Sequence, residues 1–179
     1  MLKQSYLRAM AHETISNKSF AVANEAYTMD QALAPCKRAF LSHSHLDREL
    51  ALGLKNDLAK KGVSLYIDWL DLTMPDSTNI ETARKIQAAI KAADYFLYLV
   101  TANTLNSKWC PWELGCADGF GKTKTIYIVP TVDDSNVERG KEYLGLYNIL
   151  ELDTVRGEYM EQDKMRVRST FRPGRVIFG

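Results

Sequence analysis

The chain has 179 residues, of which 46% are hydrophobic and 25% are charged, and its formal net charge is +1. This composition is typical of a globular domain, and it excludes the broad basic surface of proteins that bind nucleic acid or anionic membranes. No apolar run approaches the roughly 20 residues that span a bilayer, and the first residues lack the apolar core of a signal peptide. We therefore expect a cytoplasmic protein with no membrane and no nucleic acid among its partners.

Residues 1–36 form an N-terminal extension with mixed character. Leu2, Tyr6, Leu7 and Met10 have helical spacing, whereas the polar stretch that follows has no clear period. This pattern predicts one helix followed by an irregular arm.

Residues 37–152 alternate strand-like apolar runs with helical patterns, which predicts one α/β domain. The five runs with strand character are 38–42, 63–68, 95–101, 125–131 and 147–152. Helical stripes fill the first three intervals: leucines at every fourth position from Leu46 to Leu58, apolar residues from Ile80 to Ala93, and a segment that begins near Trp109.

Strands that alternate with helices are joined by right-handed crossovers, and this produces a parallel sheet covered on both faces. We therefore predict a three-layer, doubly wound α/β domain with a five-stranded parallel sheet. The tail at 153–179 carries several arginines among acidic residues. We expect this tail to pack on the domain or to extend it, with a solvated, self-paired surface.

Ligands of such sheets bind outside the carboxyl ends of the strands, where the loops 42–45, 68–75 and 102–108 are expected to gather. His43 and His45 lie two apart in the first loop, but the chain has only one other histidine, so we expect no metal site. The three cysteines, Cys36, Cys110 and Cys116, lack zinc-ligand and CxxC spacing and are predicted to be reduced structural thiols.

The segment 106–114 (NSKWCPWEL) is predicted to form the first turns of a helix, because Ser107 can cap it and Pro111 is tolerated so early. Trp109 and Glu113 are four residues apart and share one face, near the end where the macrodipole favours negative charge. An aromatic ring beside a carboxylate suits a flat cationic ligand. A packed tryptophan next to a solvated glutamate is the alternative that this pattern leaves open.

Three motifs of the chain together resemble those of Toll/interleukin-1 receptor (TIR) domains. They are AFLSHS at 39–44, YID at 66–68 and LNSKWCPWEL at 105–114, which resemble the first box, the strand before the BB loop and the WxxxE helix. The resemblance runs from about residue 37 to about residue 152 and implies a flavodoxin-like fold. The Phe-Trp third box of receptor TIR domains is not evident, and residues 1–35 lie outside the resemblance.

The resemblance implies one of two activities. Bacterial, plant and some animal TIR domains cleave the nicotinamide–ribose bond of NAD+, and the glutamate of their WxxxE motif, which matches Glu113, is catalytic. Asp68 matches the aspartate that ends the second strand of these domains, and Ser42 and His43 match their first loop, so these residues and Trp109 are expected to bind substrate. NAD+ is then the substrate, and no cofactor is expected. The alternative is a non-catalytic TIR scaffold that assembles signalling complexes.

Cleavage of this bond leaves positive charge on the ribose, which Glu113 could stabilise, while Trp109 could stack on a flat ring. Asp68 could orient the ribose, or it could only cap local backbone N–H groups. No G-x-S-x-G elbow surrounds Ser42, so we expect Ser42 to form hydrogen bonds and not to act as a nucleophile. Water would give ADP-ribose, and intramolecular attack would give a cyclic product.

Two further hypotheses concern the biological setting. The resemblance to stand-alone bacterial TIR proteins of the Thoeris type predicts self-assembly, a role in anti-phage immunity, and a separate effector protein that responds to the product. A related fold that transfers deoxyribose between bases remains a third possibility, and it predicts activity on nucleosides in place of NAD+.

Overall fold

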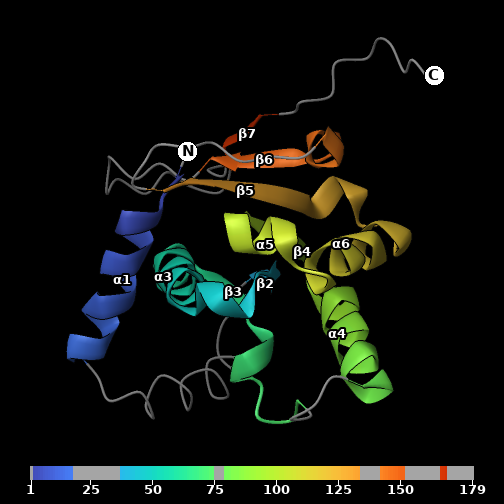
Figure 1. The fold of residues 1–179 in the computed structure, drawn as a ribbon, viewed down its shortest axis with the longest axis horizontal. Helices are drawn as coiled ribbons and strands as arrows, with labels where there is room; N and C mark the ends of the chain where they lie inside the picture. The colour runs from blue at the N-terminus through green and yellow to red at the C-terminus, as the bar shows by residue number, and fades with distance from the viewer. Residues whose placement is uncertain (1, 18–36, 75–78, 134–141, 152–165, 169–179) are drawn as a thin grey trace.

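The protein was analysed as a computed structural model that describes residues 2–17, 37–74, 79–133, 142–151 and 166–168 (Figure 1). The strands are β1 (Leu2–Lys3), β2 (Lys37–Ser42), β3 (Val63–Tyr66), β4 (Tyr95–Val100), β5 (Ile126–Val132), β6 (Asn148–Glu151) and β7 (Arg166–Arg168). The α-helices are α1 (Gln4–Asn17), α3 (Arg48–Ala59), α4 (Ile80–Ala92), α5 (Ala102–Asn106) and α6 (Trp109–Gly119). Short 3-10 helices are η2 (His45–Asp47), η3 (Asp68–Leu70), η4 (Thr123–Thr125) and η5 (Glu142–Leu146).

The sheet has the order β3-β2-β4-β5-β6-β7, and the first five of these strands pair in parallel. The chain runs from β2 outward to β3, and it then returns to place β4 on the other side of β2. This is the flavodoxin-like, three-layer arrangement that the alternating sequence pattern predicted, so the predicted fold class is confirmed.

Two short strands were not predicted. β1 pairs in parallel with the end of β5, with Leu2 opposite Thr131, and β7 pairs antiparallel with β6. Strands of two and three residues are too short to show a two-residue period, so no sequence pattern distinguishes them from neighbouring segments.

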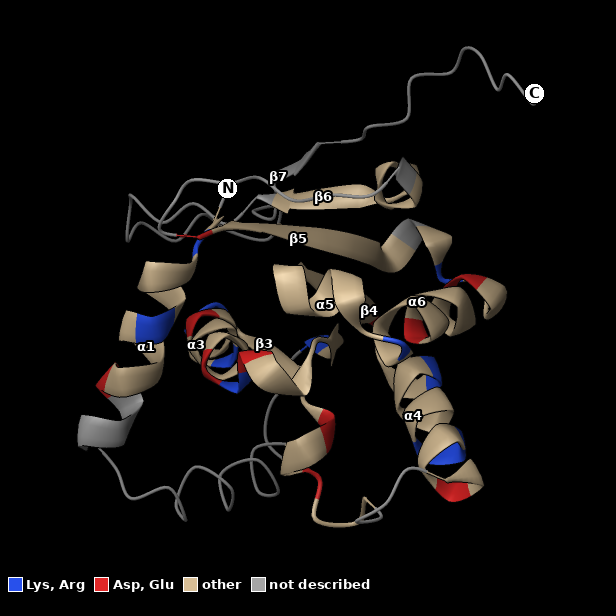
Figure 2. Ribbon diagram, in the orientation of Figure 1, with Lys and Arg blue, Asp and Glu red and all other residues tan. Residues whose placement is uncertain are grey.

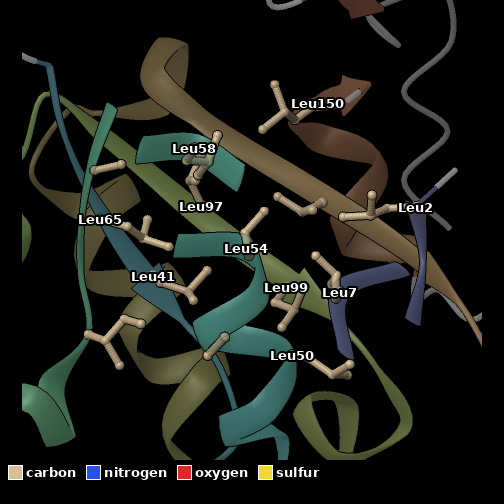
Figure 3. Packing of buried hydrophobic residues seen from close by; sticks show 14 residues of the cluster. Leu2, Leu7, Leu41, Leu50, Leu54, Leu58, Leu65, Leu97, Leu99 and Leu150 are labelled. Carbon is tan, nitrogen blue, oxygen red and sulfur yellow. The ribbon is translucent and has the colours of Figure 1, made fainter. Parts of the chain in front are cut away.

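One face of the sheet is covered by α1 and α3. Leucines from both helices and from the strands form this core, and Figure 3 shows how they interdigitate, among them Leu7, Leu41, Leu54 and Leu99. The two helices approach closely at Gly53, where an added Cβ would lie 1.9 Å from the carbonyl oxygen of Leu7. A side chain at position 53 would therefore separate α1 from α3.

The other face is covered by α4 and α6, and its core is richer in aromatic residues. Phe40 of β2 stacks on Phe96 of β4 and on Tyr66 of β3, with 5.6 Å between ring centroids in both pairs. The glycine that follows α3, Gly62, has a φ of 74°, and Gly121 after α6 has a φ of 75°. Both φ values lie in the left-handed region that favours glycine, and each glycine follows the end of its helix.

Three details differ from the sequence predictions. Leu46 and Ile80 were assigned to apolar helical stripes, but both are exposed: Leu46 lies in η2, before α3 begins, and Ile80 is the first residue of α4. β3 ends at Tyr66, so Asp68 starts η3 and does not end the strand.

Both signs of charge are present on each of the helices α1, α3 and α4 (Figure 2). Within the described part of the chain, no helix is long and apolar enough to cross a membrane. The irregular arm predicted after α1 and most of the arginine-rich tail lie outside the described residues.

Candidate active site

The candidate site lies at the carboxyl ends of β2 and β4, where the strand order reverses. Successive strands leave this point in opposite directions, so the loops after them diverge and open a crevice in which α/β proteins bind ligands. Residues of the first loop, of η3 and of α6 meet there.

Glu113 and Ser42 form the central contact of the site. Ser42 is the last residue of β2 and is fully buried, and its Oγ donates a hydrogen bond of 2.6 Å to Oε2 of Glu113. Ser42 shares the parity of Phe40 along the strand, so its side chain points to the face that α6 covers. The helix begins at Trp109 because the Oγ of Ser107 accepts the backbone N–H groups of Trp109 and Cys110.

Glu113 is only 5% exposed, and among the described residues its carboxyl group has one hydrogen-bond partner, Ser42 Oγ. Burial raises the pKa of Glu113 to about 8, the bond from Ser42 opposes this rise, and the nearby charge of Asp68 adds to it. At neutral pH the free protein therefore holds Glu113 mainly protonated. A ligand that brings positive charge into the crevice would favour the ionised form.

A thiol and a phenol lie close to Glu113. Tyr98 of β4 stands opposite Ser42 in the sheet register, and Cys110 lies one turn before Glu113 on α6. Burial raises the pKa of both groups, that of Cys110 to about 11, and the charge of Glu113 contributes to both shifts. Both groups therefore stay protonated at neutral pH, and Glu113 is the group among these that can change charge. The sequence analysis did not connect Tyr98 with the site.

His43 and Asp68 meet at the carboxyl ends of β2 and β3, where Trp69 forms hydrogen bonds with both. The side chain of His43 is 3% exposed, and its Nε2 lies 3.9 Å from Oδ1 of Asp68. The indole Nε1–H of Trp69 donates to Nε2 of His43 over 2.9 Å, and the backbone N–H of Trp69 donates to Oδ1 of Asp68 over 2.9 Å. The structure thus brings Ser42, His43, Asp68 and Glu113 to one sheet edge, although Ser42 and His43 take different partners.

Trp109 lies at the start of α6, where its ring packs edge-on against Trp112 with centroids 5.1 Å apart. The ring is half-buried against the aromatic core on this face. The packing of Trp109 agrees with the alternative reading, but Glu113 is buried and not solvated, which contradicts the rest of that reading. Stacking of Trp109 on a flat ligand stays a prediction.

A second buried carboxylate, Asp47, lies beside this edge and was not predicted. It is 5% exposed and accepts hydrogen bonds from Thr101 Oγ1 at 2.5 Å, Asn103 Nδ2 at 2.7 Å and Thr104 Oγ1 at 3.4 Å. These contacts connect η2, after β2, with the start of α5, after β4. They join residues 54 to 57 positions apart, so no local pattern could reveal them.

A cavity of about 180 Å³ adjoins Asp47 and is lined by residues of α1, η2, α3 and α5. Glu113 is not among its lining residues. Glu113 is therefore buried and does not open into this cavity. Within the described ranges, no three His, Cys, Asp or Glu side chains are grouped to hold a metal ion.

Comparison with known proteins gives two matches. A model described as TIR domain matches residues 39–166. The chain is also 34% identical over 125 residues to a protein of Bacillus cereus (strain MSX-D12) named probable 3′ cyclic ADP-D-ribose synthase ThsB′. That match covers 69% of this chain and 65% of the relative, so the chain spans less than two thirds of the relative's length.

Proposed function

This chain belongs to the TIR domain family, and we propose that it is an enzyme that cleaves the nicotinamide–ribose bond of NAD+. The observation that carries the proposal is the buried carboxyl group of Glu113, bonded to Ser42 at the point where the strand order reverses. The match to a protein named as a cyclic ADP-ribose synthase supports the same substrate.

In the proposed reaction, the bond between the ribose C1 and the nicotinamide nitrogen breaks, and its electron pair stays with the nitrogen. Nicotinamide therefore leaves as a neutral molecule, and positive charge develops on the ribose. The carboxylate of Glu113 stabilises this charge, and the hydroxyl of Ser42 orients the carboxylate. Because the leaving group departs neutral, no strong general acid is required.

Glu113 must lose its proton before it can act in this way. Since burial raises its pKa, the free protein resists ionisation, and the positive nicotinamide ring of the bound substrate supplies the charge that favours it. Desolvation around Glu113 then strengthens its attraction for the ribosyl cation. We assign Asp68 to ribose orientation and Trp109 to stacking on a flat ring of the substrate.

The ribosyl cation is captured by one of two nucleophiles. Attack by water gives ADP-ribose and releases one proton. Attack by a nitrogen of the adenine or by a ribose hydroxyl of the same molecule gives a cyclic ADP-ribose-type product. The name of the Bacillus cereus relative favours the cyclic route. We propose further that the product signals to a separate effector protein in bacterial anti-phage immunity, which rests on the family resemblance alone.

Access to Glu113 requires movement, because its carboxyl group is almost fully buried. Self-assembly through TIR contacts is one route to such a change, and the exposed apolar side chains of Leu72 and Ile80 support it. Leu72 is 89% exposed and follows η3, at the beginning of the loop that leads to α4. The same observation favours the second candidate function, a scaffold that assembles without catalysis.

The proposal is tested by incubating the purified chain with NAD+ and identifying the products by mass spectrometry. We expect nicotinamide together with ADP-ribose or a cyclic isomer from the wild type. Glu113→Gln should reduce nicotinamide release by about a thousandfold, on the scale of a lost transition-state charge contact. Glu81→Gln, on the exposed start of α4, is the matched control and should leave the rate unchanged.

Two results would overturn the enzymatic proposal. One is intact NAD+ with the wild type at all protein concentrations, and the other is equal release from wild type and Glu113→Gln. Concentration-dependent polymers that form equally in both variants, with NAD+ intact, would establish the scaffold instead.

A further inference from the structure

The hydrogen bond between Trp69 and His43 determines the protonation state of the histidine. An indole N–H can only donate, so Nε2 of His43, at 2.9 Å, must accept and carries no proton. The proton then lies on Nδ1, which donates to the carbonyl oxygen of Leu41 over 3.2 Å. Burial lowers the pKa of His43 and agrees with this neutral form.

Trp69 is held from three sides. Its indole N–H is bound at the end of β2, its backbone N–H is bound by Asp68, and the guanidinium of Arg48 lies 5.1 Å from its ring centroid. Arg48 begins α3, so the ring is held between the ends of β2 and β3 and the start of that helix. The ring also packs against the leucine-rich core.

We propose that Trp69 and His43 form a latch that fixes the start of the loop after β3 and thereby positions Asp68 at the carboxyl edge of the sheet, near the end of β2 that Glu113 contacts through Ser42. Asp68 directly precedes Trp69, its Oδ1 accepts the Trp69 backbone N–H, and its charge acts on Glu113. A shift of the Trp69 ring would therefore move Asp68 relative to Glu113. His43 is then a positioning residue, in place of the substrate contact implied by the family resemblance. The effect on catalysis rests on the proposed function, whereas the latch itself does not.

Protonation of His43 would open the latch. A second proton on Nε2 would place two donors, that nitrogen and the indole N–H, against each other. The charged groups that face His43 are Asp68 from η3, Asp47 from η2 and Arg48 from α3. The two carboxylates favour the protonated ring, while Arg48 and burial oppose it. In acid, Oδ1 of Asp68, at 3.9 Å, is the acceptor within reach of Nε2.

The latch is tested first by NMR on the full chain without substrate. The chain has three tryptophans, so its spectrum should show three indole N–H cross-peaks. The cross-peak that disappears in Trp69→Phe belongs to Trp69. We expect this cross-peak to move strongly in His43→Ala and as the pH falls. It should stay near its wild-type position in His43→Gln, because the glutamine oxygen can accept the same bond and does not titrate.

The positioning role is tested by the kinetics of nicotinamide release. Trp69→Phe keeps a ring beneath Arg48 but removes the N–H, so kcat/KM should fall by about tenfold or more while the protein remains folded. In His43→Ala, kcat/KM should fall by a similar factor. In His43→Gln, kcat/KM should keep at least about a third of the wild-type value. His43→Gln should keep the rise of kcat/KM with pH that the ionisation of Glu113 produces, and should lose only the further decline that protonation of His43 adds in acid. His12→Gln, an exposed histidine on α1, is the matched control.

An unmoved Trp69 cross-peak in His43→Ala would overturn the latch, and so would equal losses in His43→Gln and His43→Ala. The positioning role would be overturned if the Trp69 cross-peak moves in His43→Ala but Trp69→Phe retains the wild-type kcat/KM. If His43→Ala does not fold, His43→Gln and Trp69→Phe decide the question. Absence of NAD+ cleavage by the wild type would refute the proposed function and leave the NMR test valid.

Discussion

Asp47 and Glu113 are two equally buried carboxylates at neighbouring points of the same sheet edge, and their surroundings differ. Each is 5% exposed. Asp47 accepts hydrogen bonds from the side chains of Thr101, Asn103 and Thr104, whereas Glu113 accepts from Ser42 alone within the described part of the chain. Side-chain donors replace the lost hydration of Asp47, whereas the lost hydration of Glu113 is replaced only in part.

On the proposed function, this difference separates a structural carboxylate, Asp47, from a catalytic one, Glu113. Three donors replace the water that Asp47 loses, so its charge fixes the loops after β2 and β4 to each other. One donor does not replace the water lost by Glu113, and the burial cost appears as a pKa raised to about 8. An incompletely satisfied carboxyl group at a ligand-binding edge is typical of a catalytic position.

Removal of Asp47 should give the largest loss of stability. Asp47→Ala leaves the hydroxyl of Thr101 and the amide of Asn103 without their acceptor in a buried place, which costs about 2–4 kcal/mol. We expect this loss in the free energy of unfolding from urea denaturation. A loss below about 0.5 kcal/mol would mean that the three donors do not anchor the loops.

Glu113→Gln is the counterpart of Asp47→Ala, and it should increase the free energy of unfolding above about pH 8. Because the pKa of Glu113 is raised, the folded state binds more protons than the unfolded state between pH 4.5 and about 8. Stability contributed by this group is therefore lost as pH rises through that window. At higher pH the glutamine variant should exceed the wild type by more than roughly 1 kcal/mol. A variant less stable than the wild type there would remove the contrast with Asp47.

Loss of the single donor to Glu113 should have a smaller effect on catalysis. Ser42→Ala removes the bond that favours the ionised carboxyl group, so the pKa of Glu113 should rise further and kcat/KM at neutral pH should fall by about tenfold. Ser44→Ala is the matched control, because Ser44 is buried nearby but its side chain bonds only the backbone N–H of Leu46 among the described residues. Equal activity of the two variants would show that the bond from Ser42 does not tune Glu113.

The parallel sheet could be predicted because its signals are local and repeated. The apolar runs at 95–101 and 125–131 and the stripes between them mark strands and helices without knowledge of the fold. β1 could not be predicted, because a strand of two residues depends on its pairing with Thr131 and Val132 far along the chain. The exposed Leu46 shows the limit of the pattern, since periodicity does not locate the first turn of a helix.

The position of the candidate site could be predicted where one short segment holds its residues. The spacing of Trp109, Pro111 and Glu113 placed the carboxylate at the start of a helix, and the strand order brought it to the crevice. The bond of Trp69 to His43 joins residues 26 positions apart, and Asp47 depends on partners still farther away. Such contacts arise from tertiary packing, so no sequence period encodes them.

The most direct measurement is the pH dependence of kcat/KM for nicotinamide release, which reports the ionisation of the free enzyme. Because Glu113 must be ionised to act, kcat/KM should rise with pH, level off with a midpoint of about 8, and lose this rise in Glu113→Gln. A profile that is flat from about pH 6 to about pH 9, or one that Glu113→Gln retains, would contradict the account.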